Sequence, residues 1–189
     1  MWKNTSTRYG LIARTLHWSM APLLFGLILL GLWMTGLEYH NPWYHRAPAI
    51  HEGFGVIAFA LFVVRLIRRR IDPPPPLGAM PEWERVAARW THGLLYLLMG
   101  ATPVTGYLIT TAKGRPVEVF GWFSIPAPFA GKSGLEDLAG QIHLVFGITL
   151  GALALAHMAA ALKHHFFHRD DVLRRMAGAL PDKPNHLNA

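Results

Sequence analysis

The sequence predicts an all-α integral membrane protein built as a four-helix bundle, and two observations carry this prediction. Apolar residues make up 52% of the 189 residues and charged residues only 15%, which lies outside the usual balance of soluble domains. Four apolar stretches have about the 18 to 22 residues that a helix needs to cross a bilayer. They lie at about 16–37, 50–67, 94–111 and 142–162, within a single domain of residues 1–189.

The positive charges are distributed unevenly between the two ends of this bundle. Of the eighteen Lys and Arg residues, fourteen fall before the first helix, between the second and third, and after the fourth. The other four are Arg46, Lys113, Arg115 and Lys132. Because basic loops stay in the cytoplasm, both termini are predicted to be cytoplasmic. The same placement favours membrane lipid over nucleic acid as the partner of a chain with a formal charge of +7.

The segments between the predicted helices have their own character. The run Asp72–Pro76 must end the second helix, because proline lacks the amide donor and clashes with the preceding turn. Residues 112–137 form a long outer loop, rich in glycine and proline, whose aromatic side chains suit a membrane interface. Residues 170–176 have the spacing of a short amphipathic helix on the inner surface, or equally of a solvated helix end.

The chain contains no cysteine, which limits the cofactors that it can hold. Disulfides, thiolate-bound metals, iron–sulfur clusters and covalent attachment of heme through a Cys-x-x-Cys-His motif are all excluded. Any cofactor must therefore be held by histidine, by carboxylate or by packing.

Two histidines of the fourth helix lie fourteen residues apart, at His143 and His157. Fourteen residues of α-helix advance about 21 Å and end about 40° short of four full turns. Both side chains therefore face the same way, one near the outer and one near the inner membrane level. An ionisable side chain at such a depth is expensive and marks a functional site by default.

Each level also receives a histidine from another helix. His17, at the start of the first helix, lies at the inner level, and His51, at the start of the second, lies at the outer level. Depth therefore pairs His17 with His157 and His51 with His143, as two bis-histidine heme sites in the bundle core. A single intramembrane histidine is as often a structural hydrogen-bonding residue, but four at matching depths favour ligation.

The remaining inner histidines allow several roles. His92 begins the third helix at the inner level and could compete with His17 as a ligand, or bond to a heme propionate or a quinone. His164 lies two turns after His157 on the same face, where it could exchange protons with a quinone headgroup, and His165 is its neighbour. His168 is interpreted as an ordinary interfacial histidine.

Several short motifs together resemble the prokaryotic cytochrome b561 family, and the resemblance covers nearly the whole chain. They are Leu16-His17-Trp18, Ile50-His51, Val64-Arg65-Leu66, Thr91-His92-Gly93, Pro103-Val104-Thr105-Gly106, Ile142-His143, Leu155-Ala156-His157 and His164-His165-Phe166-Phe167. The resemblance implies a diheme cytochrome of the bacterial inner membrane, with two b hemes on the four paired histidines. It also implies electron exchange with ubiquinone.

Within that family, the chain is most similar to the stand-alone superoxide oxidases, which pass electrons from periplasmic superoxide to ubiquinone. Filled axial positions leave no open site on iron, so superoxide would react by outer-sphere transfer. Arg46, Lys113, Arg115 and Lys132 are the cations that could steer this anion. They could equally be loop charges without a steering role.

Two other classes stay open. The first is a cytochrome b subunit that docks a periplasmic redox protein through the long outer loop. The second is a non-redox membrane transporter whose histidines line a proton path or bind a transition metal. The transporter is disfavoured, because proton relays usually recruit Asp or Glu and the four stretches contain essentially none apart from Glu52.

Overall fold

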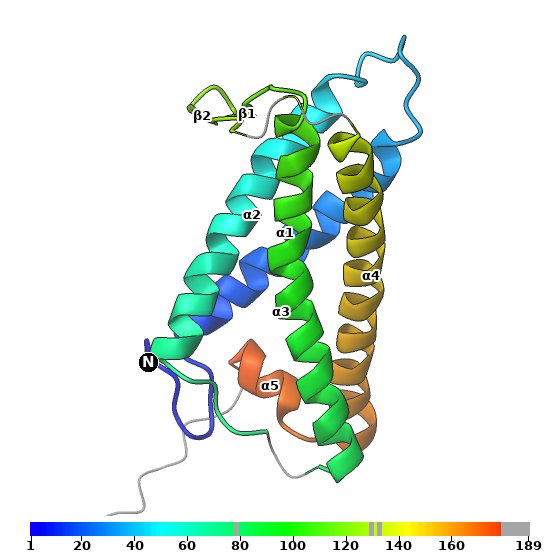
Figure 1. Cartoon of the computed structure of the whole chain (residues 1–189). Helices are drawn as coiled ribbons and strands as arrows, with labels where there is room; N and C mark the ends of the chain where they lie inside the picture. Colours follow the sequence, from blue (N-terminus) through cyan, green and yellow to red (C-terminus); the bar gives the residue numbers. More distant parts are fainter. Residues whose placement is uncertain (78–79, 129–130, 132–133, 179–189) are drawn as a thin grey trace, which may run out of the picture.

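Four long helices form the body of the structure, a computed structural model that describes residues 1–77, 80–128, 131 and 134–178. They are α1 (Leu11–Met34), α2 (Arg46–Ile71), α3 (Glu82–Thr111) and α4 (Leu135–Lys163). Each is long and apolar enough to cross a membrane. Consecutive helices run in opposite directions, and α1 crosses obliquely behind the others (Figure 1). The main helix pairs are α3 with α4 and α1 with α2.

The two ends of the bundle differ. One end holds the N-terminal segment 1–10 and the short helix α5 (Val172–Ala177), and we call it the terminal end (Figure 1). The other end holds the strands β1 (Val117–Val119) and β2 (Phe123–Ile125), and we call it the hairpin end. Among the described basic residues, thirteen belong to the terminal end and its flanking helix turns, and three, Arg46, Lys113 and Arg115, to the hairpin end.

The helices extend beyond the apolar stretches that predicted them. Helix α3 begins at Glu82 rather than near Leu94, and its first turns carry charged residues. Helix α1 also begins early, at Leu11, but at its other end it stops at Met34, short of the predicted Leu37. Hydropathy marks only the part of a helix that needs an apolar surrounding, whereas the backbone hydrogen bonds continue into the polar flanks.

The outer loop contains a small hairpin that the all-α prediction did not include. Strands β1 and β2 pair antiparallel, with Val119 opposite Phe123. Three residues connect the paired residues Val119 and Phe123, and the backbone N–H of Trp122 donates to the Val119 carbonyl oxygen at 2.9 Å. Phe120 and Gly121, at the centre of this turn, both have positive φ, at 53° and 74°, as a type I′ turn requires. Val119 is almost fully buried, and β1 packs on α2. The hairpin therefore fixes part of the loop over the bundle.

The terminal end is tied together by hydrogen bonds from the N-terminal segment. The backbone N–H of Asn4 donates to the Asp72 carboxylate at the end of α2, at 3.1 and 3.2 Å. The Arg175 side chain of α5 donates to the carbonyl oxygens of Thr7 and Pro76, at 2.8 and 3.0 Å. These bonds hold α5 across the ends of α1 and α2.

The outward faces of the long helices are apolar. Leu29, Leu97 and Val145 are 66%, 64% and 59% exposed, respectively. Large apolar side chains exposed in this way around a bundle are typical of a surface that contacts lipid. Inward positions such as Leu27 and Leu98 are buried instead.

Candidate functional site

The histidine pair at the hairpin end comes from α2 and α4. The ring centroids of His51 and His143 lie 5.9 Å apart, with the ring planes at 78°. The predicted outer pair is therefore brought together inside the bundle. Two imidazoles that share one metal ion, with bonds of about 2 Å, place their ring centroids about 6 Å apart. The observed separation matches that value.

Helix α3 holds His143 in one orientation. Its Nδ1 lies 2.9 Å from the carbonyl oxygen of Thr102 and 3.3 Å from the Thr105 hydroxyl. Since a carbonyl oxygen can only accept, Nδ1 carries the proton and donates it, which leaves the Nε2 lone pair free for a metal ion. The role of Thr102 could not be predicted from the sequence, because its carbonyl oxygen is the acceptor and every residue has one.

Glycines give both of these rings their space. A Cβ atom added to Gly106 of α3 would lie 2.9 Å from Cε1 of His143, and one added to Gly31 of α1 would lie 3.1 Å from Cε1 of His51. Nδ1 of His51 is buried without a well-formed hydrogen bond among the described residues, and the imidazole interacts with the backbone of Leu27 on α1. Two features fit a ligand held at this level: the buried imidazole nitrogen lacks a well-formed hydrogen bond, and both rings approach the backbone at positions where only glycine leaves room.

Three histidines, rather than two, meet toward the terminal end. The ring of His157 on α4 lies 6.4 Å from that of His17 on α1 and 5.1 Å from that of His92 on α3, between centroids. The predicted partners His17 and His157 are therefore close. His92 is also close to His157. The distance between the rings of His17 and His157 is nearer to the value of about 6 Å for two imidazoles on one metal ion than the distance between the rings of His92 and His157.

An open pocket lies beside this histidine group at the terminal end. It is lined by residues that include Leu16, Arg65, Arg69 and Tyr96. Nε of Arg65 donates to the Tyr96 hydroxyl at 3.1 Å, and the Arg69 guanidinium lies 5.1 Å from the centre of the same ring. A cationic pocket of this kind can receive a carboxylate or a quinone oxygen.

His164 and His165 lie past the end of α4, in a turn of π-helix over His164–His168. His164 is buried and contacts Asp170, Glu84 and His168. Nδ1 of His165 is buried and has no hydrogen-bond partner in the described part of the chain. Glu84 escaped the sequence analysis because it lies eighty residues away from His164, and the i, i+4 spacing of His164 and His168 was the signal that could have indicated a cluster.

The predicted steering cations lie at the hairpin end. Arg46 begins α2, while Lys113 and Arg115 follow α3, and all three are exposed. In the described ranges none of them forms an ion pair. Lys132 lies outside the described residues.

These features define a class of protein, a multi-pass helical membrane protein with paired histidines at two levels of its core. A sequence model of the prokaryotic cytochrome b561 family matches residues 8–179. The chain therefore belongs to the prokaryotic cytochrome b561 family, which binds b hemes and transfers electrons in membranes.

Similar proteins carry related names. "Cytochrome b561 homolog 2" of Escherichia coli (strain K12) is 44% identical over 176 residues, which cover 93% of this chain and 94% of that protein. "Cytochrome b561 homolog 1" of the same organism is 31% identical over 131 residues, covering 67% and 72%. A Yersinia pestis protein named "Probable superoxide oxidase CybB" is 26% identical over 172 residues, covering 89% and 95%.

Proposed function

We propose that this protein is a diheme cytochrome of the bacterial inner membrane that oxidises superoxide and reduces ubiquinone. His51 and His143 would hold one heme b, and His17 and His157 the other. Bound there, heme b supplies one-electron transfer. The observation that carries this proposal is the pairing of these four histidines at two levels, at 5.9 and 6.4 Å between ring centroids.

The ligand assignment is supported by the state of the side chains. The Thr102 carbonyl fixes His143 with Nε2 available, and glycines on α1 and α3 leave the space that His51 and His143 occupy. Two histidines at each level would fill both axial positions of an iron ion. Small oxidants and reductants would then react without binding to the metal.

The charge asymmetry supports an orientation for the protein. The terminal end carries most of the described basic residues, which supports a cytoplasmic location for both termini and a periplasmic location for the hairpin end. In this orientation the His51–His143 pair lies toward the periplasm. Superoxide does not cross the bilayer readily because it is an anion, so the periplasmic side is where it would be captured.

Arg46, Lys113 and Arg115 supply exposed positive charge at the hairpin end, without ion-pair partners in the described residues. Unpaired cations raise the local concentration of an anion and its rate of encounter. Lys132 belongs to the same set by sequence. The name of the Yersinia pestis relative supports superoxide as the substrate.

Ubiquinone would be reduced near the terminal end, close to His92 and the pocket of Arg65 and Tyr96. The overall reaction takes two superoxide anions, one ubiquinone and two cytoplasmic protons, and gives two oxygen molecules and ubiquinol. Histidines are suited to deliver these protons. His92 and His165 are the candidates, and the contacts of His164 point to a different role.

Rapid mixing of the oxidised holoprotein with superoxide tests the proposal. The expected result is two hemes per chain, fast reduction of the heme α band, and reoxidation that depends on added ubiquinone. Superoxide dismutase should abolish the reduction. If superoxide reduces the protein no faster than it disappears spontaneously, the donor is instead a docked periplasmic redox protein, and copurification of that partner becomes the next measurement.

A further inference from the structure

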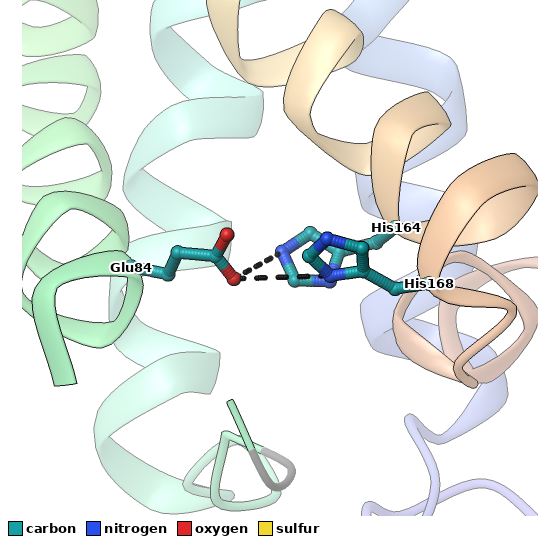
Figure 2. A group of neighbouring side chains, drawn as sticks. All are labelled: Glu84, His164 and His168. Carbon is teal, nitrogen blue, oxygen red and sulfur yellow. Dashed lines mark ion pairs between the residues drawn. The ribbon is translucent and has the colours of Figure 1, made fainter. Parts of the chain in front are cut away.

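We propose that Glu84, His164 and His168 form a binding site for a divalent cation of the zinc class at the terminal end, separate from the four paired histidines. Glu84 comes from the first turn of α3, and the two histidines from the π-helical turn that follows α4. Figure 2 shows the Glu84 carboxylate and both imidazoles pointing toward one another. The site therefore joins two helices at their ends.

The ligand atoms have nearly the spacing that a tetrahedral ion requires. Oε2 of Glu84 lies 3.5 Å from Nε2 of His164 and 3.9 Å from Nδ1 of His168, and one ligand atom from each of the three residues lies within 4.8 Å of the others. Zinc bonds of about 2.0 to 2.2 Å at tetrahedral angles separate ligand atoms by about 3.4 Å. A small contraction brings the three side chains onto one ion and leaves a fourth position for water.

The Glu84 carboxylate is poised for such an ion. It is only 7% exposed, and its Oε2 accepts no hydrogen bond in the part of the chain that the structure describes. Its other oxygen, Oε1, accepts a hydrogen bond from Lys163 at 2.8 Å. A buried carboxylate oxygen without a donor is costly, so the free oxygen directed at two imidazoles calls for a cation.

Asp170 orients His164 by accepting a hydrogen bond from the ring nitrogen that would not bind the ion, as carboxylates beside zinc-binding histidines do. Its Oδ2 lies 2.5 Å from Nδ1 of His164, and its Oδ1 accepts a hydrogen bond from the backbone N–H of Val172 at 3.0 Å. With Nδ1 protonated and facing Asp170, Nε2 of His164 is free to coordinate the ion. Carboxylate–histidine–metal arrangements of this kind fix the tautomer and raise the basicity of the ligand.

The backbone supports the same arrangement. The π-helical turn puts His164 and His168 on one side, with ring centroids 4.9 Å apart. Arg169 then adopts a left-handed conformation, with φ of 53°, which reverses the chain so that Asp170 reaches back to His164. π-turns are common at the C-terminal ends of helices, and here the turn aligns the two histidines.

Zinc titration of the holoprotein, after removal of metals with a chelator, tests this site. We expect one zinc ion per chain by elemental analysis after equilibrium dialysis, and an affinity at least tenfold weaker in Glu84→Gln and in His168→Ala. Asp170→Asn should weaken binding by about 10- to 100-fold, as loss of an outer partner does. Matched controls are Glu82→Gln, an exposed carboxylate two residues away, and His40→Ala, an exposed histidine at the hairpin end.

Lys163→Met provides an opposite-sign test. Because the ammonium group of Lys163 repels a cation bound to Glu84, its removal should tighten zinc binding several-fold, whereas a merely structural carboxylate would gain no affinity. The heme absorbance of each variant reports whether it is folded. If Glu84→Gln does not fold, His168→Ala still tests the site, because the His168 side chain is partly exposed and contributes less to folding. Equal zinc binding by the parent, Glu84→Gln and His168→Ala would overturn the site, without bearing on superoxide oxidation.

Discussion

At the residue scale, the chemistry of the core depends on which nitrogen of each histidine forms a hydrogen bond and which one stays free to bind a metal ion. For His143 the answer lies in the backbone of α3, since the Thr102 carbonyl takes the Nδ1 proton. For His51 the Nδ1 atom has no well-formed hydrogen bond among the described residues, the backbone of Leu27 interacts with the imidazole, and Gly31 leaves room for the ring. Neighbouring helices, rather than the histidines themselves, thus prepare the site.

The substitution His143→Ala should remove one heme and leave the other. Since the His17–His157 pair lies at the opposite level and shares no residue with His51, the heme-to-chain ratio should fall from two to one. A pyridine hemochrome assay against protein mass measures this ratio, with His40→Ala as the control. Retention of two hemes would show that His143 is not an axial ligand.

Gly106→Ala should disturb the same site without removing a ligand. The new methyl carbon would lie 2.9 Å from Cε1 of His143, closer than side chains tolerate, so the ring must turn or move. The low-spin EPR signal of one heme should shift, or that heme should be lost. Gly93→Ala in the same helix is the matched control, because its Cβ meets no atom within 4 Å, and it should stabilise the helix by about 0.5–1 kcal/mol. Identical spectra for both variants would contradict the close contact.

At the element scale, the ends of the helices do the positioning. The hairpin places the Phe120 ring against Gly53 of α2, where a Cβ atom would lie 2.7 Å from Cζ. At the opposite end, α5 is held by the side chain of Arg175. Neither element spans the membrane, yet each fixes the approach to one level of the bundle.

Arg175→Ala should release α5 from the terminal end. It removes two hydrogen bonds from a charged donor, each contributing about 1.5–3 kcal/mol, so amide exchange over residues 172–177 should accelerate by at least about tenfold. Hydrogen-exchange mass spectrometry measures this effect. Arg174→Ala is the control, because its exposed pairing with Asp171 at 3.7 Å stabilises little. Unchanged protection in Arg175→Ala would mean that other contacts hold α5, such as the hydrogen bonds that Arg14 and Trp18 donate to the carbonyl oxygens of Ala177 and Met176, at 2.8 and 3.2 Å.

At the scale of the whole molecule, charge and hydropathy act together. Apolar outward faces hold the bundle in lipid, and the excess of basic residues at the terminal end selects one orientation. In the proposed orientation, the few cations of the hairpin end face the periplasm. The proposed direction of electron transfer follows from this asymmetry and not from any one residue.

Reversing the charge of Arg46, Lys113 and Arg115 together should slow reduction by superoxide. Loss of steering typically lowers encounter rates by about tenfold or more, and the remaining rate should rise with ionic strength, because salt then screens a repulsion instead of an attraction. Stopped-flow measurement at low and high salt checks both effects. Arg89→Glu, an exposed cation at the terminal end, is the control. If superoxide reduces the triple variant as fast as the parent protein, these residues are ordinary loop charges without a steering role.

Much of this protein could be predicted from local patterns. The four helices were predicted from runs of apolar residues, because lipid imposes a minimum length on any helix that spans it. The approach of His143 to His51, and of His157 to His17, followed from helical rise and depth alone. The hairpin was missed because its two strands are three residues long and are stabilised by contact with α2.

The sequence by itself determined the membrane class, the charge asymmetry and the levels at which histidines lie, because these depend on spacing along one helix. Only the tertiary structure decided which side chains meet across helices. It brought His92 closer to His157 than His17 is, gave His143 its acceptor, and joined Glu84 to His164 and His168. Such contacts depend on the rotation and crossing of whole helices, to which many weak packing interactions contribute, and no local pattern records them.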